Sequence, residues 1–416
     1  MLDRFAGAAI LALAGATHAV AADAVVPVKA QAEAISGAQQ WQLFYNQEVR
    51  YFSWRGDRGF PAAFTTQRGS GSQLYTPATI SLTGVTPDVL KFEFVGRGGY
   101  VDSKQTTPGL SGSVSHLTDT VGSATWTYLA LPGVQPYFSL NVNAPTGKSV
   151  LPGTDGFARM DPDLVDIPTF GEGWNFGGTL GMNVALAENV IGSLAVGHTI
   201  RNSYDRDNPS PTGSLGIVDL SPGDVTTINA ALGFRQGALT SQISGSYSHE
   251  GATSFNGVPA FQLGDRIIVL SQSSYAWSET SVTSLTVSWN HFQKNRVLSP
   301  PPLLVSEAFN SNSNVYRVRL EHAFSFGTWS VGPIVSWLLR DENAYSPTAF
   351  QFVPAKTRWG AGGTARYQVN DRSLFYATVE HIWIEEENRP VAPPGGPIPD
   401  ISLRGWAAAV GGTFRF

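Results

Sequence analysis

The chain has 416 residues, of which 14% are charged and 42% hydrophobic, with 44 Gly, 11 Trp, 23 Phe and no Cys. The lack of Cys excludes a disulfide framework and thiolate metal sites, and the formal net charge of -5 argues against a nucleic-acid partner, because phosphate binding needs a basic surface. The low share of charge beside an ordinary hydrophobic share indicates that apolar and polar residues are interleaved along the chain.

The first 21 residues are predicted to be a secretory signal peptide. Arg4 precedes a short apolar run, and Ala19 and Ala21 form the A-x-A pattern at which signal peptidase cleaves. The run is too short to cross a bilayer as a helix. We therefore expect cleavage near Ala21, a periplasmic linker at residues 22–40, and a folded unit at residues 41–416.

From residue 41 onward, apolar and polar residues alternate with a period of two, which is typical of strands that face two environments. In the segment LKFEFVGRGGY at 90–100, aromatic and aliphatic residues share one face, whereas Lys91 and Arg97 lie on the other. Segments at 174–186 and 315–326 repeat this split. The pattern predicts strands that are apolar on one side only.

Connections between these segments alternate in length. Short ones such as NDR at 370–372 follow long ones rich in Pro, Gly, Asn, Ser and Asp, which include 55–73, 101–119 and 145–172. Tight turns at one end and long loops at the other are typical of an outer-membrane barrel. A soluble β-sandwich or propeller also alternates, but it does not need so aromatic an apolar face.

The strand number follows from counting these connections. Residues 89–416 hold fourteen strands, and the alternating segments at 41–54 and 74–84 add two. We therefore predict an all-β fold, a transmembrane antiparallel up-and-down barrel of sixteen strands. Fourteen strands around an N-terminal plug is the alternative, since Pro77 weakens the second added strand.

The last strand carries an apolar face up to the final residue. Trp406, Val410, Phe414 and Phe416 share this face, which is expected to contact lipid. The ending resembles the C-terminal recognition strand of bacterial outer-membrane proteins, which closes on Phe. Phe414 and Phe416 are therefore the predicted assembly signal, with the barrel-assembly machinery as partner and outer-membrane lipid as surroundings.

The sequence shows no established motif for catalysis or metal binding. The seven His show no metal-ligand spacing, and GLSGS at 109–113 lacks the strand-to-helix context of a nucleophile elbow. We predict no catalytic residue, no metal and no cofactor. An outer-membrane hydrolase stays open by analogy with other barrels.

A lumen is expected because a barrel of this size is wide enough to hold water. Its wall carries more cations than anions, and most of these charges are expected to solvate the interior and pair with one another. The predicted lumen-wall cations are Lys91, Arg97, Arg317, Arg319, Arg358 and Arg366.

The loop 145–172 is the longest and most acidic connection. In general porins, whose layout this chain resembles, such a loop folds into the lumen, where its acids face wall arginines and define a constriction. A solvated surface loop is the alternative. The candidate constriction residues are Asp155, Asp161, Asp163, Asp166 and Glu172.

A family resemblance covers residues 117–186. The runs LTDTVGSATWTYLAL, PYFSLNVNAPTGKS and FGEGWNFGGTLGMNVAL resemble outer-membrane proteins of the MetA-pathway of phenol degradation, in which an Asp-led strand, a Pro-Thr-Gly ending and a Gly-x-Gly-aromatic strand recur. The resemblance implies passive passage of small solutes, aromatic ones among them. Related members resemble export pores for extracellular fibres.

Three functions follow in order of preference. The first is an outer-membrane channel for diffusion or uptake of small solutes, aromatic or anionic, in a Gram-negative bacterium. An export or structural barrel is second, and a membrane hydrolase third. The sequence leaves the solute, the direction of transport and the oligomeric state open.

Overall fold

The computed structural model describes residues 41–60, 65–86, 89–210, 213–299, 303–349, 351–387 and 400–416. The predicted signal peptide, its cleavage site and the linker fall at residues 1–40, outside the described residues. They stay predictions.

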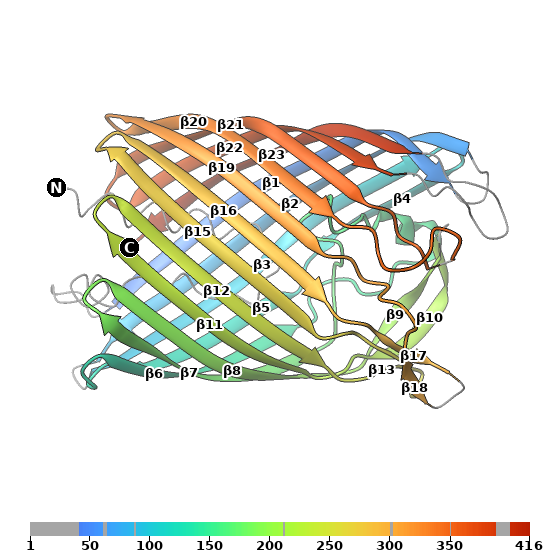
Figure 1. Cartoon of the computed structure of the whole chain (residues 1–416), viewed down its shortest axis with the longest axis horizontal. Helices are drawn as coiled ribbons and strands as arrows, with labels where there is room; N and C mark the ends of the chain where they lie inside the picture. The colour runs from blue at the N-terminus through green and yellow to red at the C-terminus, as the bar shows by residue number, and fades with distance from the viewer. Residues whose placement is uncertain are drawn as a thin grey trace.

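Across the described ranges, sixteen strands pair antiparallel in chain order, and β1 closes the ring by pairing with β23 (Figure 1). The barrel strands are β1 (Trp41–Phe60), β2 (Thr65–Val85), β3 (Leu90–Thr107), β5 (Thr120–Tyr128), β6 (Val134–Ala144), β7 (Asn175–Ala187), β8 (Val190–Arg201), β11 (Val225–Gln236), β12 (Leu239–Glu250), β15 (Arg266–Ser278), β16 (Ser281–Phe292), β19 (Val315–Phe326), β20 (Trp329–Arg340), β21 (Lys356–Asn370), β22 (Ser373–Glu386) and β23 (Ile401–Arg415). The predicted sixteen-stranded fold is confirmed, and β1 and β2 belong to the wall rather than to a plug.

Tight turns join the strands at the left end of Figure 1, where the C-terminus also lies; we call it the short-turn end. Gly237 and Gly327 occupy two of these turns with φ of 58° and 59°, values that favour glycine because it has no Cβ. The Phe416 N–H donates to the Leu43 carbonyl at 2.9 Å. The last residue is therefore fixed to the neighbouring strand.

The opposite end, here the long-loop end, departs from prediction in two places. The predicted loop 55–73 is mostly strand, since β1 ends at Phe60 and β2 begins at Thr65. The predicted loop 101–119 is also wrong, because β3 continues to Thr107 and β4 (Leu110–Leu117) folds back on it. Their Gly, Ser and Thr residues resemble loop composition, but backbone pairing between two adjacent segments suffices to form a ribbon.

A second sheet lies at the long-loop end, at the right of Figure 1, built from parts of three connections. Its strands are β9 (Tyr204–Ser210), β10 (Gly213–Ser221), β13 (Thr253–Phe255), β14 (Val258–Gln262), β17 (Arg296–Leu298) and β18 (Leu304–Ser306). A short 3-10 helix, η2 (Gly153–Ala158), lies in the connection between β6 and β7.

The barrel exterior is apolar, because alternate residues of each strand point outward with large exposed side chains such as Leu180, Val196 and Val410. Aromatic pairs concentrate near both ends: Trp41 with Phe92 and Trp329 with Tyr367 at the short-turn end, and Trp337 with Trp359 near the long loops. Such an apolar band between two aromatic girdles is the surface of a membrane-spanning barrel. Within the described ranges, no helix is long and apolar enough to cross a membrane.

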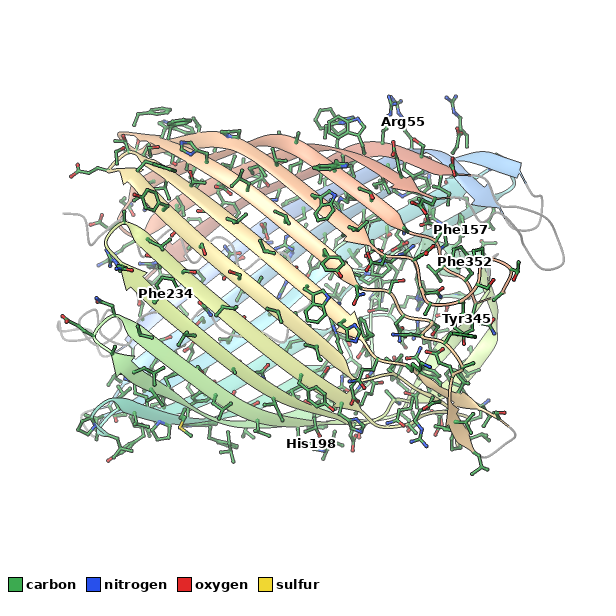
Figure 2. All side chains as sticks on the ribbon, viewed as in Figure 1. Arg55, Phe157, His198, Phe234, Tyr345 and Phe352 are labelled. Carbon is green, nitrogen blue, oxygen red and sulfur yellow. The ribbon has the colours of Figure 1, made fainter. Side chains whose placement is uncertain are left out.

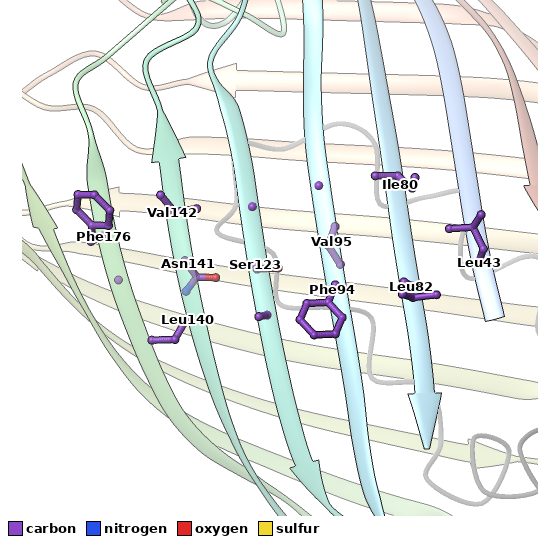
Figure 3. A pocket seen from close by; sticks show the side chains of 14 residues that line it. Leu43, Ile80, Leu82, Phe94, Val95, Ser123, Leu140, Asn141, Val142 and Phe176 are labelled. Carbon is purple, nitrogen blue, oxygen red and sulfur yellow. The ribbon is translucent and has the colours of Figure 1, made fainter. Parts of the chain in front are cut away.

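This outer face is hollowed from β1 to β7, where a groove of about 690 Å³ is lined mainly by apolar side chains (Figure 3). Gly96 and Gly122 leave its centre without side chains, and Phe94, Leu140 and Phe176 stand beside it. The groove belongs to the apolar band.

Candidate functional site: the lumen and its inserted loop

The connection between β6 and β7, residues 145–174, enters the barrel and contacts the inner wall; we call it the inserted loop. Its Met160, Leu164 and Val165 pack in one buried cluster with inward-facing wall residues, among them Trp54 and Ile382. A second buried cluster joins loop residues Leu151, Ala158 and Phe170 to Tyr75 and Val101 of the wall and to Val114 of β4. Burial of these apolar groups holds the loop against one side of the lumen.

Asp163 is the most buried acid of the inserted loop. Arg340 Nη1 lies 3.1 Å from its Oδ2, and Arg317 Nη2 lies 3.6 Å from its Oδ1. Arg358 donates to the backbone carbonyl of Asp163 at 3.0 Å. Three wall cations from β19, β20 and β21 therefore converge on one loop residue.

Asp161 contacts the ammonium group of Lys356 directly, and its Oδ2 lies 3.9 Å from Arg340 Nη1. Burial favours the neutral carboxyl, but Lys356, the Asp163 backbone N–H and Arg340 outweigh it and hold the pKa of Asp161 below its ordinary value. Glu386 on β22 also contacts Lys356, at 3.0 Å. The loop therefore joins a network of alternating charges at the long-loop end of the wall.

Asp166 extends the attachment to β1, since its Oδ2 lies 3.1 Å from Arg50 Nη1. Arg50 in turn donates to Glu48 at 2.6 Å. Beside it, Gln73 on β2 donates to the Ile167 carbonyl at 2.9 Å, and Ser103 on β3 donates to the Ala158 carbonyl at the same distance. The inserted loop is thus bonded to β1, β2 and β3 as well as to β19, β20 and β21.

The other two predicted acids do not join this network. In the described part of the chain, neither Asp155, in η2, nor Glu172, near the end of the loop, forms an ion pair. The Glu172 backbone N–H instead donates to Asp119 Oδ2 at 2.7 Å. The five predicted acids therefore separate into three wall-bonded residues and two that lie elsewhere on the loop.

Asp119, which the sequence analysis did not single out as a site residue, holds the base of the inserted loop. Its carboxylate accepts from the N–H of Gly147 at 2.9 Å and from the Asn143 side chain at 2.8 Å, in addition to Glu172. A Cβ on Gly147 would come within 2.0 Å of the Phe170 carbonyl oxygen, so only glycine fits there. The Asp-led strand, the Pro-Thr-Gly ending and the Gly-x-Gly segment that carried the family resemblance thus meet at one place.

All six predicted lumen-wall cations lie on inward-facing positions of their strands, opposite in parity to the exposed apolar residues. Arg319 pairs with Glu380 at 2.6 Å, Arg366 with Glu321 at 2.5 Å, and Lys91 with Glu93 at 3.2 Å. Ion pairing of this kind was the expectation for most lumen charges.

Some inward-facing cations have no acidic partner. Among the described residues, no carboxylate forms an ion pair with Arg97, Arg235, Arg266 or Arg358, whereas Glu48, Glu93, Glu250, Glu321, Glu380 and Glu386 of the wall all contact a cation. Arg266 instead donates to Asn290 at 2.9 Å and lies 5.1 Å from the centre of the Phe292 ring. The inner wall therefore keeps an excess of positive charge.

No protein-family model matches the chain, and no curated protein matches it. Among solved structures it is similar to an outer-membrane channel from Pseudomonas putida F1 (12% identity, 62% of this chain and 91% of that one, TM-score 0.38). It is also similar to a mutant of the monoaromatic hydrocarbon channel TodX (10%, 91% and 91%, 0.38) and to a mutant Rhodopseudomonas blastica porin (14%, 90% and 100%, 0.33). The fold itself rests on the strand pairing described above.

Proposed function

We propose that this protein is an outer-membrane channel through which small solutes, anionic ones above all, diffuse passively past the inserted loop. The observation that carries the proposal is the attachment of the loop by Asp161, Asp163 and Asp166 to one side of the inner wall. A loop fixed in this way narrows the lumen of a sixteen-stranded barrel. Because the loop is held against the wall, it does not swing across the lumen and close it.

The passage runs along the facing wall, formed by β8, β11, β12, β15 and β16. This wall carries Arg235 and Arg266 without acidic partners, while its Arg201 pairs with Glu250 at 3.1 Å. Unpaired cations between low-dielectric walls raise the local concentration of anions. The proposed selectivity therefore comes from the open wall, whereas the acids of the loop are neutralised where they touch cations.

Orientation follows from the general layout of such barrels, with the short-turn end in the periplasm and the long loops outside. Phe414 and Phe416 lie at the proposed periplasmic end, where Phe414 packs against Tyr45 and Phe375. Recognition by the barrel-assembly machinery, export through a cleaved signal peptide and assembly into an oligomer stay proposals.

Planar-bilayer recording tests the channel. The parent should conduct, and the sign of its zero-current potential in a salt gradient should indicate a preference for anions. The salt should be dilute, because higher concentrations screen the wall charges. The double variant Arg235→Gln/Arg266→Gln should lose part of that preference, whereas Arg404→Gln, on the outer face, removes one charge and should leave it unchanged. A cationic sign in the parent would overturn the proposed selectivity.

The same preparation distinguishes the other two functions. A barrel that stays sealed until a secreted partner is added would be an export pore. Release of fatty acid from phospholipid vesicles by a non-conducting barrel would indicate a hydrolase. Either result would refute a diffusion channel.

A further inference from the structure

A polar groove of about 750 Å³ lies on the outside of the barrel, over β22, β23, β1, β2 and β3 toward the long-loop end, with His381 of β22 at its border. Strand pairing arranges its residues in two rows across the sheet. The first row runs from Arg404 through Arg55 to Ser70. The next row runs from Trp406 through Ser53 and Ser72 to Lys104. Small hydroxyl residues therefore form the floor. Arg404 and Arg55 stand on one side and Lys104 on the other.

Its cations point away from the lumen. Arg55, Lys104 and Arg404 are exposed and share strand parity with exposed apolar residues such as Tyr51 and Trp406. Figure 2 shows Arg55 at the outer surface of the barrel, toward the end that carries the long loops. These charges are therefore separate from the passage.

The two arginines face each other across a strand pair, an arrangement that costs energy unless an anion lies between them. No carboxylate of the described residues forms an ion pair with Arg55, Arg404 or Lys104. Asp57, the nearest acid along β1, stands opposite Arg68 in the ladder. Asp102, on the same face of β3 as Lys104, forms no ion pair either, so among the described residues the cations of the groove have no carboxylate in direct contact.

The height of the groove fits a lipid headgroup. Between Trp41 and Tyr51, β1 rises by about 33 Å, which is about 25 Å along the barrel axis at a tilt of about 40°. This equals the usual height of the apolar band, so Tyr51 marks its outer edge. Arg55 and Arg404 lie beyond that edge, in the layer that headgroups occupy.

We propose that this groove binds the phosphorylated headgroup of a lipid in the outer leaflet of the outer membrane. The guanidinium groups of Arg55 and Arg404 and the Lys104 ammonium bond the phosphate oxygens, and the serine hydroxyls of the floor donate to the same oxygens. Tyr51 and Trp406, on the membrane side, contact the first part of the acyl chains. This inference rests on the proposed outer-membrane placement but not on solute passage.

Binding of fluorescent bisphosphorylated lipid A to the purified barrel in detergent micelles, followed by anisotropy, tests the proposal. The parent should bind it at least about tenfold more tightly than the dephosphorylated lipid, because charge-assisted bonds are lost. Arg55→Gln/Arg404→Gln should bind about tenfold more weakly than the parent. The matched control Arg296→Gln/Arg372→Gln removes two exposed charges elsewhere and should bind as the parent does.

Heat-modifiable migration verifies that each variant is folded, and Lys104→Gln replaces the double variant if that one fails to fold. The proposal would be overturned if the parent and the groove variant bound lipid A with equal affinity. It would also be overturned if free pyrophosphate displaced lipid A with an affinity equal to that of lipid A, because the groove would then be a site for soluble anions. Conductance of the folded groove variant should equal that of the parent. The two measurements therefore test the two proposals separately: anisotropy tests the lipid site, and conductance tests the channel.

Discussion

At the scale of single residues, the inserted loop is held by contacts between opposite charges in a partly buried place. Asp163 is 7% exposed and meets Arg340 and Arg317, while Asp161 meets Lys356. A buried acid is tolerated when cations and hydrogen-bond donors replace its water. Removing one side of such pairs should have a larger effect than removing an exposed charge.

The triple variant Asp161→Asn/Asp163→Asn/Asp166→Asn removes three negative charges and keeps side-chain size. Arg340, Lys356 and Arg50 then lose acidic loop partners, and each unit charge is worth about 1 kcal/mol at 4 Å even in a water-like dielectric. We expect the anion-to-cation permeability ratio to rise several-fold in dilute electrolyte, with a modest change in conductance. The control Asp155→Asn/Glu172→Gln changes two acids of the same loop that lack wall cations, and an equal shift in both variants would contradict this role for the ion pairs.

Acid should release the loop, and the sign follows from the pKa of Asp161. Since the folded pKa lies below the ordinary value of 3.8, the charged form stabilises the folded loop above that value, and the stabilisation is lost as pH falls through the folded pKa. Single-channel recordings from pH 7 downward should stay steady until below about pH 4 and then become noisier as the loop detaches. In Asp161→Asn the acid transition should be weaker; a transition identical to that of the parent would assign it to other groups.

At the scale of elements, the alternation of apolar and polar residues was enough to predict the barrel strands, because one face of each strand meets lipid and the other water. It could not place β9, β10, β13, β14, β17 and β18, which form three short hairpins joined into one sheet only by the pairing of β10 with β13 and of β14 with β17. The loop-like composition of residues 101–107 also prevented prediction of the continuation of β3, whose Val101 and Ser103 are buried by contact with the inserted loop. Such pairing depends on tertiary contacts that local sequence does not contain.

The candidate site was predicted only in part for a similar reason. Acidity and length marked the inserted loop and its three wall-bonded acids, but nothing local distinguished them from Asp155 or Glu172. The sequence marks Asp119 only as the first acid of a strand, because its role depends on three backbone segments that meet in the fold. The outward cations Arg55 and Arg404 become neighbours only through closure of β1 on β23.

Replacing Asp119 by Ala should loosen the base of the inserted loop. The N–H groups of Gly147 and Glu172 lose their acceptor, at a cost of up to about 1–3 kcal/mol for each group that water cannot reach. We expect faster digestion of the loop by added protease, measured on intact barrels, and noisier conductance. Asp119→Asn keeps one acceptor oxygen and should fall between parent and Ala variant; identical digestion of all three would remove Asp119 from this role.

Deletion of Phe416 concerns the strand that closes the barrel. The deletion removes the hydrogen bond from Phe416 to the Leu43 carbonyl and the exposed ring at the short-turn end. We expect less assembled barrel at equal export, measured as the heat-modifiable fraction of total protein. Substitution of Phe416 by Leu preserves the backbone hydrogen bond but removes the aromatic ring. The difference between this variant and the deletion therefore separates the contribution of the hydrogen bond from that of the ring. Unchanged assembly after deletion would argue against an assembly signal.

At the scale of the whole molecule, the closed ring of strands and the apolar outer surface determine where the protein resides. A closed ring leaves no unpaired sheet edge, so every backbone group of the wall can be satisfied without water. The exterior between the girdles presents apolar residues that water would solvate poorly, while ionised groups turn inward, where several of them pair. This inversion of the soluble pattern requires lipid around the barrel.

The expected location is therefore the outer membrane, and cell fractionation tests it. The protein should sediment with outer-membrane markers and resist extraction by high salt, because apolar burial rather than surface charge holds it there.

On detergent gels, unheated samples should migrate faster than boiled ones, since a closed ring of antiparallel strands stays compact until heat breaks the hydrogen bonds between its strands. Changing Val410 and Leu194, both in the apolar band, to Lys should lower recovery in the membrane, because a charge on the lipid face costs up to about 2–4 kcal/mol at the midplane and less toward the edges of the band. The matched change of inward-facing Thr413 and Ser193 to Lys should be tolerated, because those side chains can reach water in the lumen. Recovery of the parent in the soluble periplasmic fraction would refute the membrane placement altogether.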